Sequence, residues 1–394
     1  MEASYNSKAQ FDARILGFII FGVTFRLLPP VDAGDMNKPM DKSFFVTVAD
    51  VACAAKVSKA TVARVLGGYG VISDKVRREV LHAAKLLHYQ PNELARSMTT
   101  GRSGIIGVVV ADIGNPFFSL AVRGITDAAR DAGFNVMIAN SSESIEAEKA
   151  AVRALIGKRV DGLIITPSRS DDTAHLKEIH ESGRPLGLLD RALTDIDTDT
   201  VSGNDRVAAK RAAEALIAAG HRRLVYMTTA GARGHKFHTV AQLQISSVRE
   251  QILGFLRACR VAEIPDPESG VHLGANSPEA TLAMARALLS RNDRPTGIIA
   301  SDSQIALEIF RAVRESGMKI PSDLSLVTFR NADWTTVTDP PITVIDQPLY
   351  ELGRRVSEMV VRRVQGYGLP AERLQLKAAM IHRGSIGPPP PNHI

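Results

Sequence analysis

Residues 46–66 read VTVADVACAAKVSKATVARVL, and this stretch contains two signals for the start of a helix. At the first, Thr47 can accept from the backbone N–H three residues on, and Asp50 can reach back to the helix start. The second signal is Ser58, and apolar residues fall at helical spacing after both. A third helix is predicted to begin after Ser73, with its apolar side closing a small core. Two short helices joined by a tight turn and closed by a third are typical of a helix-turn-helix unit.

The second predicted helix carries side chains that suit the major groove of DNA. It presents Lys59, Ala60 and Arg64 in its N-terminal half. The planar guanidinium of an arginine delivers two parallel donors to the O6 and N7 atoms of guanine. Hydroxyl groups near a helix start suit phosphate oxygens. The predicted DNA contacts of this segment are Thr47, Ser58, Lys59, Ala60, Thr61, Arg64 and Ser73.

The positive charge of the chain is concentrated in this region. The 394 residues carry a formal net charge of +6. Residues 46–102 hold nine Lys and Arg against four Asp and Glu, whereas residues 103–394 hold 34 against 33. A small basic module joined to a large, nearly neutral body favours a nucleic-acid binder. The alternative is a solvated basic face that has no partner.

The first 45 residues are set apart from the fold. Residues 15–28 read ILGFIIFGVTFRLL, but Arg26 interrupts the run, which is too short for a spanning helix of ~20 residues. A signal peptide is disfavoured because acidic residues offset the single arginine before the run and no small-residue cleavage site follows. Met36 and Met40 lie just before the first patterned segment. We therefore expect a disordered extension or a mis-assigned start.

From residue 104 onward, apolar runs alternate with helical patterns. This rhythm predicts an α/β fold of two parallel sheets, each of about five or six strands with helices on both faces. The predicted strands are residues 105–110, 135–139, 162–166, 186–189, 224–227, 297–300 and 325–329. The predicted helices are residues 116–132, 143–158, 172–182, 208–219, 251–259, 277–289 and 303–316.

Composition and motif searches exclude several classes of protein. Hydrophobic residues are 45% and charged residues 23% of the chain, which excludes a disordered or collagen-like protein. Cys53 and Cys259 are the two cysteines, and they form neither a disulfide framework nor a zinc motif. A cytoplasmic location is the simplest expectation. The sequence contains no phosphate-binding loop, no HExxH and no GxSxG, so we expect no enzyme activity, no cofactor and no metal.

Several sequence blocks occur together in a specific order. They include the opening stretch, then YQPNELARSM, IIGVVVADIGNPFFSLAVRGITDAARDAGFNV, PTGIIASDSQIALEIFRAVRESGMKIPSDLSLVTF and DPPITVIDQPLYELG. With these blocks the chain resembles the lactose-repressor family of bacterial transcription regulators (LacI/GalR type), from residue 46 to about residue 385.

The resemblance implies a domain organisation. A helix-turn-helix DNA-binding headpiece would span residues 46–90, and a hinge helix with a linker would span residues 91–103. Residues 104–394 would form a periplasmic-binding-protein-like body of two Rossmann-like subdomains with a ligand cleft between them. The expected N-terminal subdomain comprises residues 104–203 and 321–348, and the expected C-terminal subdomain comprises residues 204–320 and 349–394.

The resemblance also assigns a role to residues 91–98. They would form a hinge helix that pairs with its twin in the minor groove, where Met98 takes the place of the family's wedging leucine. Ala95 would face the groove floor, and Asn92 and Arg96 are further expected DNA contacts. An unbranched apolar side chain is a suitable wedge between base steps. The alternative is that Met98 packs on the partner's hinge helix without intercalating.

The loops that follow the predicted strands hold the candidate effector contacts. They are Asp112, Asn115, Phe117, Asp190, Arg191, Arg249, Gln251 and Asp302. Asn115 can cap a helix or bind a polyol, and Phe117 can pack on a sugar ring or fill the core. Asp190 and Arg191 have a surface turn as their alternative. Asp302 can be an N-cap, and the resemblance makes it an acceptor for sugar hydroxyls.

Departures from the family pattern bear on the ligand and on the DNA contacts. Gln251 and Ala275 stand where the family commonly has an arginine and an aromatic residue. The basic stretch 231–247 favours an anionic effector, a sugar acid or a sugar phosphate, or else is a mobile surface loop. Ala63 and Gly67 remove two possible phosphate donors.

The combined interpretation is a homodimeric or tetrameric transcription repressor. It would bind a palindromic double-stranded DNA operator and respond to a sugar, sugar acid or sugar phosphate, with no membrane partner. The alternative is a sensor or solute-binding protein whose headpiece does not read DNA sequence.

The hinge hypothesis predicts the behaviour of Met98→Gly. Removing the wedge and lowering helix propensity by ~1 kcal/mol should give weak, less bent and less specific DNA complexes. The headpiece itself should stay folded. DNA bending measured by energy transfer checks this, and bending equal to that of the unmutated chain would show that Met98 does not intercalate.

Overall fold

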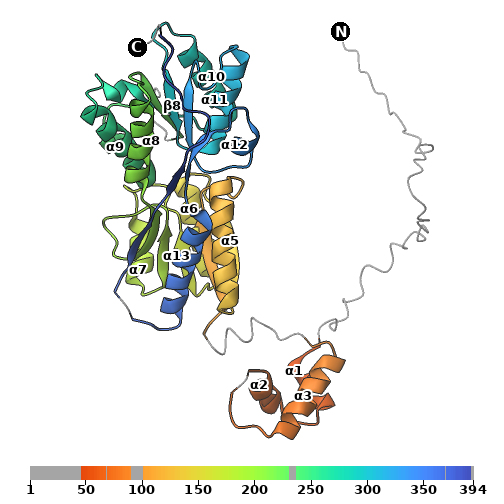
Figure 1. Cartoon of the computed structure of the whole chain (residues 1–394). Helices are drawn as coiled ribbons and strands as arrows, with labels where there is room; N and C mark the ends of the chain where they lie inside the picture. Colours follow the sequence, from red (N-terminus) through yellow and green to blue (C-terminus); the bar gives the residue numbers. More distant parts are fainter. Residues whose placement is uncertain (1–45, 68, 90–100, 230–236, 369, 392–394) are drawn as a thin grey trace, which may run out of the picture. The chain divides into compact units, whose positions relative to one another are not determined.

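The computed structural model describes residues 46–67, 69–89, 101–229, 237–368 and 370–391. The predicted hinge helix and residues 231–236 of the basic stretch 231–247 lie outside these residues. The chain divides into two compact units, Met1–Pro91 and Asn92–Ile394, which are described here one at a time. We call the described part of the first unit the headpiece and that of the second unit the body (Figure 1).

The headpiece contains the three predicted helices, α1 (Val48–Ala54), α2 (Lys59–Gly67) and α3 (Asp74–Leu86). Each helix contributes one valine with no exposed surface to the shared core, namely Val51, Val62 and Val80. The tight turn between α1 and α2 is closed by Lys56, whose φ of 52° is left-handed. A lysine takes this conformation at a cost, because only glycine enters it freely.

The body contains two six-stranded sheets. The first sheet has the order β11-β5-β4-β3-β1-β2, and its strands are β1 (Ile105–Val110), β2 (Asn135–Asn140), β3 (Gly162–Ile165), β4 (Leu186–Leu189), β5 (Asp199–Gly203) and β11 (Arg373–Leu376). The second sheet has the order β12-β10-β9-β8-β6-β7, and its strands are β6 (Leu224–Thr228), β7 (Val271–Leu273), β8 (Gly297–Ala300), β9 (Ser325–Phe329), β10 (Thr343–Asp346) and β12 (Ala379–Ile381). All paired strands are parallel except β10 and β12, which are antiparallel.

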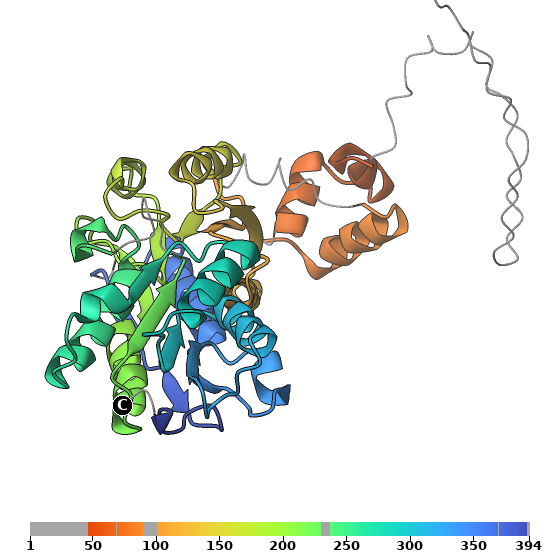
Figure 2. The same ribbon diagram turned by 90° about the horizontal axis from the view of Figure 1, so that it is seen from above.

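Helices cover both faces of each sheet, as predicted for an α/β fold. The first sheet packs against α5 (Pro116–Asp131) and α13 (Leu349–Val364) on one side, and against α6 (Ile145–Gly157) and α7 (Ala174–Glu181) on the other. The second sheet packs against α8 (Asp205–Ala218) and α9 (Ser246–Val261) on one side, and against α10 (Pro278–Leu289) and α11 (Ser303–Glu315) on the other. Figure 2 shows the green helices on one side of the second sheet and the teal helices on its other side. Three short helices complete the body, namely η2 (Val240–Gln242), η3 (Pro267–Gly270) and α12 (Trp334–Val337).

The expected division of the body into subdomains is wrong in its last third. Residues 321–348 belong to the second sheet, because β9 and β10 pair with β8 and β12 there. In contrast, α13 and β11 return to the first sheet. The reason is steric fit, since Val360 of α13 packs over Gly162 of β3 and Gly187 of β4, where a side chain would leave no room. We call the two halves the N-terminal and C-terminal subdomains after this correction.

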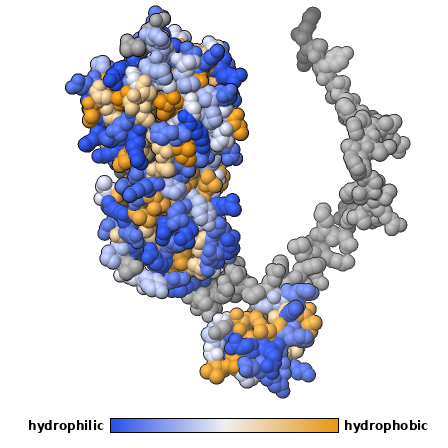
Figure 3. Space-filling view, viewed as in Figure 1, coloured by the Kyte–Doolittle hydropathy of each residue, from blue (hydrophilic) through white to orange (hydrophobic). Residues whose placement is uncertain are grey.

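The surface of the body is mixed in polarity. Figure 3 shows hydrophilic residues over much of the visible face of the body, with apolar residues interspersed. Among the residues described, no helix combines the length and the hydrophobicity required to cross a bilayer.

The closest helix crossing in the N-terminal subdomain joins α5 to α13. It needs glycine on both helices, because a Cβ on Gly124 would lie 2.0 Å from the carbonyl oxygen of Tyr350. A Cβ on Gly353 would lie 1.8 Å from the carbonyl oxygen of Ala121. Both neighbours are backbone atoms, so neither can move without displacing a helix.

This crossing predicts that Gly353→Ala destabilises the body. Overpacking typically costs ~1–3 kcal/mol, and the rigid backbone contact puts Gly353 at the upper end of that range. Urea unfolding measures the free energy of unfolding. The matched control is Gly157→Ala at the end of α6, where an added Cβ meets nothing within 4 Å. Equal stability of the two variants would contradict the prediction.

Candidate functional site

The N-terminal half of α2 is an exposed surface on a rigid support. Val62 and Val65 point into the headpiece core, which leaves Lys59, Ala60 and Arg64 exposed on the other side. Ser58 fixes the helix start, since its Oγ accepts from the backbone N–H of Thr61 at 3.1 Å. The Ser58 and Thr61 hydroxyls also lie 2.9 Å apart. The two hydroxyls therefore lie together at the helix start, and Lys59 and Arg64 are exposed side chains of the same helix.

The other predicted DNA contacts differ in where the structure places them. The hydroxyl and backbone N–H of Thr47 both donate to Asp50 at 2.7 Å, so Asp50 reaches back as predicted. These hydrogen bonds hold the pKa of the Asp50 carboxyl below its usual value, and the bond from the hydroxyl has the larger effect. Ser73 is the exposed N-cap residue of α3, which begins after it as predicted, and its side chain makes no capping hydrogen bond. Asn92, Ala95, Arg96 and Met98 lie outside the described residues.

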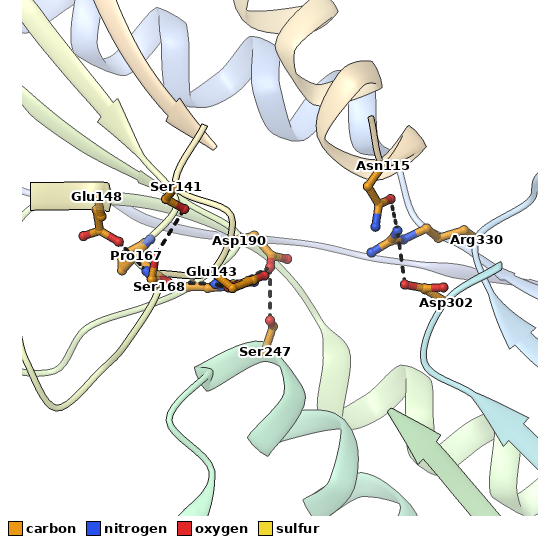
Figure 4. A network of polar contacts seen from close by, with 11 residues as sticks. Asn115, Ser141, Glu143, Glu148, Pro167, Ser168, Asp190, Ser247, Asp302 and Arg330 are labelled. Atoms are coloured by element: carbon orange, nitrogen blue, oxygen red, sulfur yellow. Dashed lines mark hydrogen bonds and ion pairs between the residues drawn. The ribbon is translucent and has the colours of Figure 1, made fainter. Parts of the chain in front are cut away.

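The second candidate site lies in the body, where strand ends of the two subdomains face each other. Hydrogen bonds link the N-terminal to the C-terminal subdomain at three places along this junction. Arg330 after β9 donates to Oδ1 of Asn115 at 2.5 Å, and Ser247 of α9 donates to Oδ2 of Asp190 at 3.0 Å (Figure 4). Gln244 donates to Oδ2 of Asp171 at 3.0 Å. We call this region the subdomain junction.

Arg330 occupies one end of the junction. Its guanidinium carbon lies 4.4 Å from the ring centroid of Phe117, and its Nη1 lies 3.9 Å from Oδ2 of Asp302. Burial lowers the pKa of Arg330 below its usual value. Of the two predicted roles of Phe117, the structure shows the ring filling the core, since it is 2% exposed and the cation covers it. Phe117 supports Arg330 through a cation–π contact.

Asp190 and Arg191 occupy the opposite part of the junction, directly after β4. Both are buried, so the alternative of a surface turn was wrong. Arg191 forms a two-point ion pair with Glu143, with distances of 2.6 and 2.7 Å, and donates to the carbonyl of Pro167. The pKa of Asp190 is raised by burial, which Arg191 only partly offsets.

Asp205 of α8 and Gln251 of α9 form a further buried hydrogen-bonded group, and the charges of Asp190 and Arg330 act on Asp205. Oδ1 of Asp205 accepts from the amides of Gln251 and Gln347, each at 3.1 Å, and Tyr226 donates to Oε1 of Gln251 at 2.8 Å. Burial, followed by the nearby charge of Asp190, raises the pKa of Asp205 to about 7. Gln251 is therefore held by protein groups where an effector contact was predicted.

The remaining predicted effector contacts serve as caps or lie apart. Asn115 caps α5 by accepting from the N–H of Phe117 at 3.0 Å. Oδ1 of Asp302 caps α11 by accepting from Gln304 at 2.8 Å and Ile305 at 3.0 Å. Asp112 is exposed and closes its own turn with Gly114. Arg249 is half-buried on α9.

The structure thus brings together Asn115, Phe117, Asp190, Arg191, Gln251 and Asp302 of the predicted set. The sequence analysis missed Glu143, Asp205, Tyr226, Ser247, Arg330 and Gln347. Arg330 could have been found, because it directly follows the predicted strand 325–329 as Asp190 follows the strand 186–189. Within the described ranges, no group of three or more His, Cys, Asp and Glu could hold a metal ion.

Comparison with known families matches the two units separately. Residues 47–92 match the bacterial regulatory proteins of the lacI family. Residues 103–383 match the periplasmic binding proteins and sugar binding domain of the LacI family. Together these matches cover the headpiece and nearly all of the body.

Individual relatives agree with this assignment. The ribose operon repressor of Halalkalibacterium halodurans is 31% identical over 86% of this chain and 96% of its own. A crystal structure of the lac repressor dimer bound to operator and the anti-inducer ONPF is 26% identical, covers 86% of this chain and 99% of its own, and has a TM-score of 0.76. A LacI family transcriptional regulator from Enterococcus faecium with bound ribose is 28% identical, covers 72% of this chain and 99% of its own, and has a TM-score of 0.62. These relatives are transcription regulators rather than enzymes, and the chain described here belongs to the LacI family of bacterial regulatory proteins.

Proposed function

We propose that this chain is a repressor that binds a palindromic operator as a homodimer and is released or retained there by a small-molecule effector. One observation carries the proposal, which is that a single chain combines two features. Helix α2 of the headpiece exposes Lys59, Ala60 and Arg64, and the body has a buried polar junction between its subdomains. The partners are double-stranded DNA, a second copy of the chain, and a sugar, sugar acid or sugar phosphate. The cytoplasm is the proposed location.

The headpiece supports DNA reading because its polar groups are sorted by position. Ser58 and Thr61 sit at the helix start, where hydroxyls and the positive end of the helix dipole suit a phosphate. Arg64 lies one to two turns further along the exposed face, where it can reach a base edge in the major groove. Two such helices related by two-fold symmetry match a palindromic site, and the lac repressor dimer bound to operator supports this arrangement.

The subdomain junction supports an effector that is rich in hydroxyl groups. Asp190 and Asp302 are buried carboxylates at strand ends of opposite subdomains, and carboxylates are strong acceptors for hydroxyls. Arg330 provides the cation that an acidic effector would require. The bound ribose in the Enterococcus faecium regulator supports a sugar. A ligand that contacts both subdomains would fix their relation, and this change can be passed to the headpieces.

The DNA part of the proposal predicts that Arg64→Ala weakens operator binding and relaxes base preference at one position per half-site. The expected loss is ~1–3 kcal/mol for a bidentate arginine–guanine contact. Binding titrations on operator and on random DNA measure it at fixed salt. Arg77→Ala, at an exposed arginine on α3, is the matched control and should change both affinities little. Equal losses on the two DNAs would make Arg64 a phosphate contact.

The effector part predicts that Asp302→Asn lowers effector affinity while the fold survives. Asparagine caps a helix about as well as aspartate, so the bonds to Gln304 and Ile305 can persist. Losing a charged acceptor in a buried site should weaken binding by roughly 1.5–3 kcal/mol. Calorimetric titration of both proteins with the same sugar measures this. Asp302→Ala separates the two roles, because it should also lose ~1 kcal/mol of stability. Unchanged affinity in a folded Asn variant would leave Asp302 as a cap only.

A further inference from the structure

The chain passes between the two subdomains three times, and the three passages meet at one cluster. The first passage follows β5 at Asn204 and Asp205, the second follows β10 at Gln347, and the third links β11 to β12 through Ala378. Asn204 donates its backbone N–H to the carbonyl of Leu376 at 3.0 Å and accepts from the N–H of Ala378 at 2.8 Å. Gln347 donates to Asp205 at 3.1 Å. We call Asn204, Asp205, Gln347, Leu376 and Ala378 the crossover hub.

Asp205 is the only ionisable member of the hub, and it is 4% exposed. Its Oδ1 accepts from two neutral amides, those of Gln251 and Gln347, and none of the described cations forms an ion pair with it. A buried carboxylate without a cation in contact is costly in its charged form, whereas the protonated acid is tolerated.

Charged and titratable groups face Asp205 from each neighbouring element. Asp190 at the end of β4 and Glu250 on α9 are negative, and Arg330 at the end of β9 is positive. The Tyr226 hydroxyl reaches it through Gln251, and the adjacent Arg206 is engaged by Glu250 at 2.7 Å. Burial is the main cause that raises the pKa of Asp205, and repulsion from Asp190 is the largest of the charge effects that add to it.

We propose that Asp205 is a positioning residue whose loss of a proton favours opening of the subdomain junction. The protonated acid lets the hub stay dry and the subdomains stay joined. The ionised acid places a second negative charge near Asp190, and opening relieves both repulsion and burial because water enters. Asp190 faces Ser247 of the other subdomain, so the same opening separates that pair.

If the subdomain junction opens as the pH rises, an effector that contacts both subdomains should bind less tightly at higher pH. Only this consequence rests on the proposed function. The opening itself can be measured without DNA or effector. A failure of operator binding therefore leaves this test intact, and a failure of this test leaves operator binding intact.

The experiment measures the separation of α7 and α9 in the full chain. These helices follow the segments that Ser170 and Gln244 join across the junction at 2.9 Å. Spin labels go on Glu178→Cys and Arg257→Cys, which are exposed positions, in a Cys53→Ser background. Cys259 is buried and its pKa is raised to about 12, so it stays unlabelled. Excess unlabelled chain keeps one labelled copy per assembly.

The expected result is a shift to longer separation between about pH 6 and about pH 8, with its midpoint near 7. Asp205→Asn should hold the short separation throughout, because its amide cannot ionise. Gln347→Met should move the midpoint to higher pH, because the carboxylate loses one of its two donors. This second variant keeps the test valid if Asp205→Asn does not fold.

The matched control is Asp346→Asn, since Asp346 is next to Gln347 and burial also raises its pKa. Its midpoint should equal that of the parent protein. A separation independent of pH in the parent protein, a shift that persists in Asp205→Asn, or a shift abolished by Asp346→Asn would each overturn the proposal.

Discussion

The threefold passage of the chain between the subdomains is the constraint on which the body depends. Because α13 and β11 follow β6 to β10 of the C-terminal subdomain in sequence, the first sheet is complete only after residue 376. Neither subdomain is therefore an independent unit joined to the other by a single linker. The hub bonds of Asn204 and Asp205 hold the passages side by side at one place.

The junction between the subdomains holds buried charges of both signs. Asp190 and Arg330 occupy corresponding places after β4 and β9, with left-handed φ values of 68° and 76°. Each donates its backbone N–H to the next strand, at 2.8 and 2.7 Å. Such conformations cost ~1–3 kcal/mol in residues other than glycine and persist only where the surroundings impose them. The two subdomains thus share one strained backbone geometry, which places a negative residue in one subdomain and a positive residue in the other. Each of these side chains makes a hydrogen bond across the junction.

The headpiece has only a very small hydrophobic core to keep it folded. Eight small or β-branched residues fill it, and they use the apolar side of all three helices. Units of this size bury a smaller fraction of their surface than large domains do and are marginally stable. The exposed residues Lys59, Ala60 and Arg64 of α2 take no part in this core.

Local sequence determined the secondary structure of this protein and many of its site residues. Helix starts at Thr47, Ser58 and Asn115, and most strands, were predictable because capping groups and apolar periodicity act within a few residues. The strand-end rule also found Asp190, Arg191 and Asp302. The short strands β5, β7, β10, β11 and β12 were missed, because all five are edge or near-edge strands whose pairing depends on distant segments.

Only the tertiary structure decided which sheet each late segment joins and how the charges pair. Nothing near α13 in the sequence reveals that Val360 fits over Gly162 and Gly187, about two hundred residues earlier in the chain. The stacking of Arg330 on Phe117 and the burial of Asp205 between two glutamines likewise join residues that are far apart in sequence. The physical reason is that steric fit and desolvation depend on what surrounds a group in space, and the spacing of neighbouring residues carries no record of it.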